Sequence, residues 1–504
     1  MRRGSLRCAA AAALALCAAQ VAAEPAAANR SLLASARALA AAPHVPPAQE
    51  LPPPFADLSY DQYRAIRPVP GRAAMLPLGP AWAVDLLPPG LYFPYPVAIE
   101  LPAGGQRFAA KDFAPDLFDF APGYFDAVPE HAPGAGFSGL RLRHPLNAPD
   151  VMDEVLVMQG ASYFRAVGRA MIYGLSSRAV AIGTGSPGAE EFPRFTRLRL
   201  HEPAGATLRL EGLIDGPSLT GHLDMRLRPG RDTTADVVVT LLPRREIVDI
   251  GVAVLTSMFL KGPLRAAVSD DYRPRVHDSN VLVMENGAGE RLWRPVANPA
   301  RVQTSSFLDD GPVAFGLWQT PRSFADFEDS EARYHDRPSA RVAPTGDWGP
   351  GAVMLVEIPT GDEYLDNIVA FWRPAEALSA GAEYRFAYRL SWARTRPLRG
   401  TDLLPIRQSR SGREHERPGT RRFVVDFAGA GAALVPDLAA SGGAELSRAA
   451  LFPLPDGRGT RVTFLLTPGA QASVDLRLVL RDDTGAAASP VWLYRWTRAR
   501  DGGV

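Results

Sequence analysis

The sequence predicts an all-β protein with two β-sandwiches, a large one followed by a small one. Three observations predict this fold class. The chain contains 45 Gly and 47 Pro residues, which interrupt helices and punctuate turns. Apolar and polar residues alternate with the period of half-buried strands at 197–200, 208–213, 223–227, 236–242, 384–392, 474–480 and 491–496. The runs after Phe423 have the size and rhythm of an immunoglobulin-like sandwich, whereas residues 45–395 suffice for a larger one.

The first 23 residues have the composition of a cleavable secretory leader. Three arginines precede an almost unbroken Ala/Leu run, and small residues follow at 21–23. The run is shorter than the ~20 residues that span a bilayer. We expect cleavage after Ala23 and export to the periplasm, by the Sec route or, given Arg2 and Arg3, by the twin-arginine route. Leu16 stands where a lipoprotein signal has a small residue, so a lipid on Cys17 is disfavoured.

Both cysteines of the chain, Cys8 and Cys17, lie in this leader, so the mature protein has no thiol for a disulfide or a metal. Loss of three leader arginines changes the formal net charge from +1 to −2. A nearly neutral surface argues against nucleic acid as a partner. No later apolar run reaches the length of a membrane span, so we expect a mature protein that does not cross the membrane.

The remaining elements follow in order along the chain. Apolar spacing predicts a helix at 30–41, and Ser59 with Gln62 forms a capping box for a short helix. The large sandwich is expected over 24–395, and the small one over 421–504. Between them, 396–420 is polar and rich in Gly and Pro, which predicts a linker between independently folded units.

Motifs for cofactor or metal chemistry are weak. Gly183, Gly185 and Gly188 spell a phosphate-loop pattern, but Pro187 and Pro193 stand where a helix would have to begin, so a tight β-loop is favoured. No Gly-x-Ser-x-Gly elbow occurs. A calcium loop built from Asp270, Asp271 and Asp278 stays open, with surface solvation of these acids favoured. We predict no cofactor and no metal.

Residues 270–375 gather carboxylates, aromatics and arginines in segments that read as loops. Carbohydrate sites need this mixture, because aromatic faces stack on sugar rings, polar groups satisfy the hydroxyls, and two carboxylates can share acid and base work. The alternative is that Trp293, Trp318 and Trp372 are core residues and the acids form an exposed rim.

Many short blocks, in order, resemble the osmoregulated periplasmic glucan biosynthesis proteins G and D. The match is dense from about 50 to 395 and looser beyond. The blocks are 60–67, 115–119, 144–147, 160–165, 173–178, 190–195, 255–259, 276–279, 292–295, 346–349 and 366–372.

The resemblance implies a galactose-mutarotase-like large sandwich joined to an immunoglobulin-like domain, and a role in making β-1,2-glucan in the periplasm. β-1,2-Glucan chains would be the ligand, and the inner-membrane glucan synthase is a candidate partner. The resemblance also implies an inverting endo-β-1,2-glucanase, with Asp366 as general acid and Asp278 as general base. The residues expected to contact substrate, or to neighbour one that does, are Tyr334, Arg333, Arg337, Trp348 and Asp347.

The chain departs from the family pattern near both aspartates. Asn280 and Val281 stand where the family usually has Asp-Gly, and Leu365 stands where Asn is common. The alternative function is a glucan-binding protein without catalysis. Two aspartates in one open groove flanked by aromatics would favour hydrolysis, whereas an aspartate in the core or paired with arginine would favour binding alone.

Overall fold

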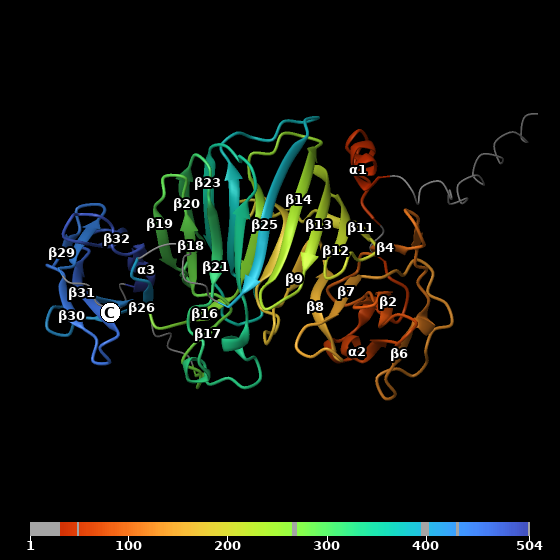
Figure 1. Cartoon of the computed structure of the whole chain (residues 1–504), viewed down its shortest axis with the longest axis horizontal. Helices are drawn as coiled ribbons and strands as arrows, with labels where there is room; N and C mark the ends of the chain where they lie inside the picture. Colours follow the sequence, from red (N-terminus) through yellow and green to blue (C-terminus); the bar gives the residue numbers. More distant parts are fainter. Residues whose placement is uncertain (1–30, 48–49, 265–269, 395–402, 430–432, 502–504) are drawn as a thin grey trace, which may run out of the picture.

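The computed structural model describes residues 31–47, 50–264, 270–394, 403–429 and 433–501. The predicted leader, its cleavage site and both cysteines lie outside these residues. Figure 1 shows the small sandwich at one side of the large one, and the short N-terminal elements at the other. Strands dominate the described chain, and the predicted all-β fold with a large and a small sandwich is confirmed.

One sheet of the large sandwich carries the strands that the alternating pattern predicted. All seven alternating segments lie inside strands of this sheet. It has 14 strands in the order β28 (Val435–Ala440), β32 (Ser473–Arg481), β33 (Val491–Thr497), β19 (Arg291–Pro295), β18 (Val281–Glu285), β21 (Ala314–Trp318), β22 (Ser339–Pro344), β25 (Tyr384–Ala393), β14 (Thr233–Pro243), β13 (Leu219–Arg228), β12 (Leu208–Asp215), β11 (Arg194–Leu200), β4 (Ala98–Pro102) and β5 (Phe108–Ala110).

The second sheet has no alternating sequence pattern at its centre, because every residue of its strands β10, β15 and β23 is buried. Its apolar face packs against the first sheet in one continuous core, which includes Leu156, Phe164, Leu223 and Val237. It has ten strands in the order β2 (Leu76–Gly79), β3 (Trp82–Leu87), β7 (Gly139–Pro145), β8 (Met152–Gln159), β9 (Tyr163–Ala166), β10 (Ser176–Ile182), β15 (Ile250–Ser257), β24 (Ile368–Pro374), β23 (Gly351–Glu357) and β20 (Gln303–Asp309).

The second layer of the small sandwich is a five-stranded sheet, which packs on the β28, β32 and β33 strands of the first sheet. The five-stranded sheet contains β26 (Ile406–Arg413), β27 (Arg421–Ala428), β31 (Gly459–Thr467), β29 (Glu445–Leu446) and β30 (Ala450–Pro453). β26 lies within the segment 396–420 that was predicted as a linker, and it pairs along its length with β27. We therefore propose to place the boundary between the sandwiches before β26, at residues that lie partly outside the described chain.

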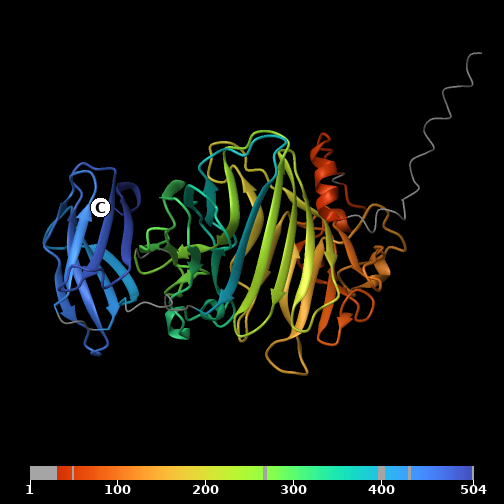
Figure 2. The same cartoon turned by 45° about the horizontal axis from the view of Figure 1, so that its top comes forward.

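The two sandwiches share a sheet and a core. β33 pairs in parallel with β19, which joins strands of the small sandwich to those of the large one. Trp293 and Trp318 of the large sandwich belong to the same buried cluster as Phe423, Phe464 and Trp492 of the small one. In Figure 2 the small sandwich lies beyond the edge of the large one. Whether the two sandwiches fold independently, as the sequence predicts, stays a prediction.

Helices are few among the described residues. α1 (Leu32–Ala40) matches the helix predicted at 30–41 and packs on the large sheet through Leu32 and Ala36. α2 (Tyr60–Arg64) begins with the predicted Ser59–Gln62 capping box. The remaining helices and paired strands are α3 (Arg498–Asp501), η2 (Phe55–Asp57), η3 (Pro115–Leu117), η4 (Phe324–Asp326), η5 (Tyr334–Asp336), β1 (Ile66–Pro68) with β6 (Phe118–Phe120), and β16 (Phe259–Lys261) with β17 (Val276–His277). Within the described residues no helix is long and apolar enough to cross a membrane.

Candidate active site

Asp366 lies two residues before the start of β24, beside a row of polar side chains on the ten-stranded sheet. The strand register pairs Ser176 of β10 with Thr256 of β15, and both hydroxyls donate to Oδ2 of Asp366, at 3.5 and 3.3 Å. Arg165 of β9 donates from Nε to the Ser176 hydroxyl at 2.6 Å, and its Nη2 lies 3.8 Å from the same carboxylate oxygen. The side chain of Asp366 is 27% exposed. The Asp366 carboxyl is thus oriented by two long hydrogen bonds and by Arg165, and it remains partly exposed to solvent.

Asp278 follows β17 directly and is buried. Its backbone N–H donates to the carbonyl of Met258, and its Oδ1 accepts a hydrogen bond from Nη1 of Arg337. Burial raises the pKa of Asp278 above its ordinary value, the Arg337 charge opposes that rise, and the Asp366 charge adds to it. The two predicted catalytic carboxyls are therefore near enough to interact electrostatically, although only one of them is open to solvent.

Tyr334 joins the Asp278 ion pair to a second carboxylate. The Arg337 guanidinium lies 4.3 Å from the centre of the Tyr334 ring. The Tyr334 hydroxyl donates to Oε2 of Glu363 at 2.6 Å, and Arg273 donates to the same oxygen at 2.7 Å. Burial raises the pKa of Tyr334, and the hydrogen bond to Glu363 raises it further. Three loops, around residues 271–278, 329–337 and 358–366, are thereby tied into one polar network.

Asn367 links the strand that positions Asp366 to the strands that position Asp278. Its Oδ1 accepts from the backbone N–H of Phe259 at 2.8 Å, and its Nδ2 donates to the Phe259 carbonyl at 3.1 Å and to the Ile358 carbonyl at 2.9 Å. Phe259 stacks on His277 with the rings 5.2 Å apart, and it lies in β16, which pairs with β17. Burial lowers the pKa of His277 to about 3, so its imidazole stays neutral and acts as part of this packing.

Of the other predicted substrate-contacting residues, Arg337 and Tyr334 lie near the Asp278 carboxylate, whereas the contacts of Arg333, Trp348 and Asp347 are made elsewhere. Arg337 lies at the Asp278 carboxylate, and Tyr334 lies beside it but is only 2% exposed. Arg333 is turned to Asp336, with which it forms an ion pair. Trp348 packs in the core against Trp372, Phe386 and Tyr388, as expected when a large aromatic is buried between sheets. Asp347 is exposed and accepts from the N–H of Gly349. No contact joins Trp348 or Asp347 to the aspartates in the described residues.

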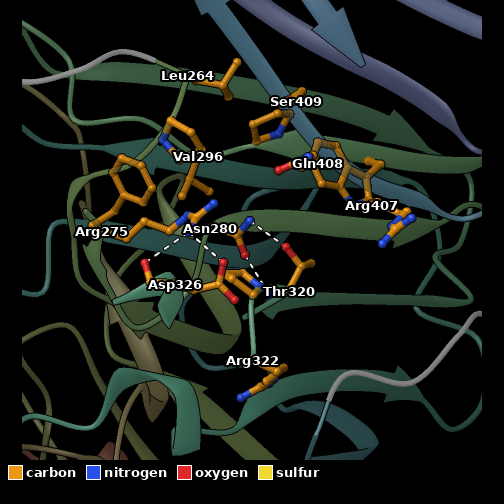
Figure 3. A pocket seen from close by; sticks show the side chains of 15 residues that line it. Leu264, Arg275, Asn280, Val296, Thr320, Arg322, Asp326, Arg407, Gln408 and Ser409 are labelled. Atoms are coloured by element: carbon orange, nitrogen blue, oxygen red, sulfur yellow. Dashed lines mark hydrogen bonds and ion pairs between the residues drawn. The ribbon is translucent and has the colours of Figure 1, made fainter. Parts of the chain in front are cut away.

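Asn280, one of the residues that depart from the family pattern, makes its side-chain hydrogen bonds to Thr320, at 2.7 and 2.8 Å. Both residues line a cavity of about 250 Å³ next to β26 of the small sandwich, together with the ion pair of Arg275 and Asp326 (Figure 3). Leu365, which also departs from the pattern, is 46% exposed beside Asp366.

The alternative motifs have structural explanations. Gly183 and Gly185 have left-handed backbone (φ 76° and 75°) in the turn that ends β10, and strand β11 follows instead of a helix. Asp271, a candidate calcium ligand, forms ion pairs with Lys261 and Arg273. Over the residues that the structure describes, no group of three His, Cys, Asp or Glu side chains is placed to hold a metal.

Sequence reasoning gave no role to several polar residues that surround the two aspartates. Arg165, Ser176 and Thr256 all lie in blocks that carried the family resemblance. The available signal was that short polar runs stand at the start of β10 and at the end of β15, next to apolar residues. Glu363 had no such signal, because it stands among other loop carboxylates and only the fold brings it to Tyr334.

The fold and this site define a class: an all-β, double-sandwich protein with two interacting carboxyls in a network of arginines and tyrosines. Residues 28–496 match the family model described as "Periplasmic glucan biosynthesis protein, MdoG". The chain belongs to this family. It is 41% identical over 478 residues to the "Glucans biosynthesis protein G" of Vibrio cholerae serotype O1, covering 93% of this chain and 86% of that protein.

A second relative of the same name, from Shewanella frigidimarina, is 40% identical over 469 residues, with 92% of this chain and 83% of the relative covered. Among solved structures, a galactose mutarotase related enzyme from Lactobacillus acidophilus is similar at 8% identity with a TM-score of 0.21. That similarity covers 51% of this chain and 91% of the enzyme.

Proposed function

We propose that this protein acts on periplasmic β-1,2-glucan as an inverting endo-β-1,2-glucanase. The observation that carries the proposal is the pair of interacting carboxyls, Asp366 and Asp278. The first is solvent-open and held by two hydroxyls, whereas the second is buried beside Arg337 with a raised pKa. Carboxyls in unequal environments are what separates an acid from a base in glycoside hydrolysis.

In the proposed reaction Asp366 protonates the leaving glucosyl oxygen, since its carboxyl is the one that solvent and a bound chain can reach. Asp278 accepts the proton of the attacking water. Because Asp278 is only 4% exposed, that proton reaches it through an intervening water or substrate hydroxyl. Arg337 opposes the rise in the pKa of Asp278 that burial causes, and so favours the charged form that a base requires.

One observation favours the second candidate, glucan binding without catalysis. Asp278 is buried and paired with arginine, which is the arrangement of a structural ion pair. In that case the same site would guide nascent glucan, and Asp278 would only fix the loops around it. The export route, the cleavage after Ala23 and a contact with the inner-membrane glucan synthase belong to either form of the proposal.

Incubation with linear β-1,2-glucan tests the proposal. We expect shorter chains, and we expect NMR to show that the newly formed reducing ends have the inverted anomeric configuration. Asp366→Asn and Asp278→Asn should each lower turnover by ~10²–10⁴-fold, because a general acid or base typically contributes that much, while glucan affinity changes little. Asp347→Asn is the matched control, because Asp347 contacts neither aspartate in the described residues. If the native protein binds the glucan and never shortens it, the binding function replaces the hydrolase.

A further inference from the structure

A hollow that has no role in the proposed chemistry is lined by Arg165, on the face of the ten-stranded sheet that carries the Asp366 contacts. Its volume is about 420 Å³, within the ~300–1,000 Å³ of ligand pockets. Val157 and Gln159 of β8 and Tyr163 and Arg165 of β9 line it. The register places Val157 opposite Arg165, so these side chains stand on the face that carries the Asp366 contacts.

An exposed aromatic residue stands at the rim of this hollow. The backbones of Gly90 and Phe93 exchange two hydrogen bonds, and both Gly90 and Leu91 have positive φ, of 117° and 54°. This tight turn carries Tyr92, which is 79% exposed, while the neighbouring Phe93 packs on Tyr63. Leu91 thus has a left-handed backbone, which is uncommon for leucine, in a turn that two backbone hydrogen bonds close.

Tyr163 supplies a second ring and a neutral hydroxyl. The Arg178 guanidinium lies 4.8 Å from the centre of its ring, and Arg178 in turn pairs with Glu190. Burial raises the pKa of Tyr163 to about 12, so the phenol keeps its proton at physiological pH. A neutral phenol both donates and accepts hydrogen bonds, as the hydroxyls of a sugar require.

Arg165 connects the hollow to the candidate active site. Its side chain is 44% exposed and lines the hollow, while its Nη2 lies 3.8 Å from Asp366. The charges around the hollow are balanced, since Arg165 faces Asp366 and Arg178 faces Glu190. Balanced charge with aromatic faces suits a neutral, hydroxylated chain better than an anion.

We propose that this hollow is a glucosyl subsite, which binds sugar units of the glucan on one side of the bond at Asp366 and stacks one of them on Tyr92. The inference rests on the proposed function only in requiring glucan to lie at Asp366. It does not require that the chain be cleaved.

Calorimetric titration of the full-length protein with linear β-1,2-gluco-oligosaccharides of increasing length tests the subsite. We expect Tyr92→Ala to weaken binding of long chains by about three- to tenfold, the range of one aromatic contact, and to leave the shortest bound chains unaffected. Val157→Trp, which fills the hollow, should do the same. Phe452→Ala is the control, since Phe452 is a 51% exposed aromatic of β30 in the small sandwich.

Each outcome has its own consequence. If the native protein binds no β-1,2-glucan of any length, the proposed function fails and the subsite with it. If the native protein binds glucan and both variants match it at every chain length, only the subsite is overturned. Equal weakening at every length would place Tyr92 at the Asp366 site itself and also overturn a separate subsite.

Discussion

At the residue scale, burial and Arg337 act in opposite directions on the pKa of Asp278. Burial raises that pKa, and the guanidinium holds it down. The folded protein therefore binds the Asp278 proton more tightly than the unfolded chain, in which aspartate has a pKa of about 3.9. Stability from this group is fully present below that pH and is lost as the pH rises through the folded pKa.

Replacing Arg337 should shift the pH profile of glucan hydrolysis. In Arg337→Met the opposing charge is gone, so the pKa of Asp278 rises further. If Asp278 is the base, activity falls as it becomes protonated, and the acid limb of kcat/KM moves to higher pH. Arg337→Lys, which keeps a positive charge, should shift the limb less.

The direction of the shift identifies the role of Asp278. If the alkaline limb of the kcat/KM profile moves instead of the acid limb, Asp278 is the general acid. Asp366 would then be the general base. Circular dichroism at each pH controls for folding, because a buried carboxylate without its partner costs ~3–5 kcal/mol. An unchanged profile in a folded Arg337→Met protein would remove Asp278 from the chemistry.

At the element scale, β24 and the β16–β17 pair hold one aspartate each, and Asn367 joins them. Asn367→Ala would leave the buried N–H and C=O of Phe259 and the C=O of Ile358 without this partner. We expect a loss of about 1–3 kcal/mol in the free energy of unfolding for each buried group left unpaired. We also expect a lower kcat with little change in KM, since the two carboxyls lose their common support.

Urea unfolding and steady-state kinetics measure the two effects. Asn147→Ala is the matched control, because the Asn147 side-chain amide also makes two hydrogen bonds but lies at an exposed turn: it donates to Asp153 and accepts from the backbone N–H of Ala170. Asn367 is a positioning residue only if kcat falls in protein that remains folded under the assay conditions. Full kcat in a destabilised Asn367→Ala protein would leave it a purely structural role.

Elements differed in how well the sequence predicted them, and burial explains the difference. β12, β13 and β14 alternate because one face meets the core and the other carries polar residues. β10 and β15 are buried throughout, so their apolar runs carry no period that separates strand from helix. The sheet that positions Asp366 was for this reason the one that periodicity missed.

At the scale of the whole molecule, the seam between the sandwiches is a hydrophobic core. Val281 and Val283 of β18, with Trp293 and Trp318, are buried in the cluster that the small sandwich completes. Outside the core, Arg477 of the small sandwich pairs with Glu290 of the large one at 3.0 Å. The large sandwich therefore presents an apolar face that needs the small sandwich as its cover.

A chain that ends at residue 394 should not be a stable substitute for the full protein. Truncation would expose two buried tryptophans and two buried valines. Each fully buried apolar side chain that becomes exposed lowers the free energy of unfolding by about 1.5–3 kcal/mol. We expect a lower midpoint of thermal unfolding and association in size-exclusion chromatography. The Arg477→Gln variant of the full chain, which loses only the exposed ion pairs with Glu290 and Asp437, should change the midpoint little. Equal thermal midpoints for the truncated and full chains would show that the sandwiches fold independently.

The sequence by itself determined the all-β class, the half-buried strands, the two short helices near the N-terminus and the family, because each depends on local patterns or on order along the chain. Only the tertiary structure decided what surrounds each aspartate. Asp366 meets Thr256 and Ser176 through strand register, and Asp278 meets Arg337 across a loop, contacts between residues 59 to 190 positions apart. Trp348 had the residue type of a sugar platform, yet the packing of the sheets placed it in the core. Local sequence constrains backbone shape, whereas burial and pairing depend on which distant segments the fold brings into contact.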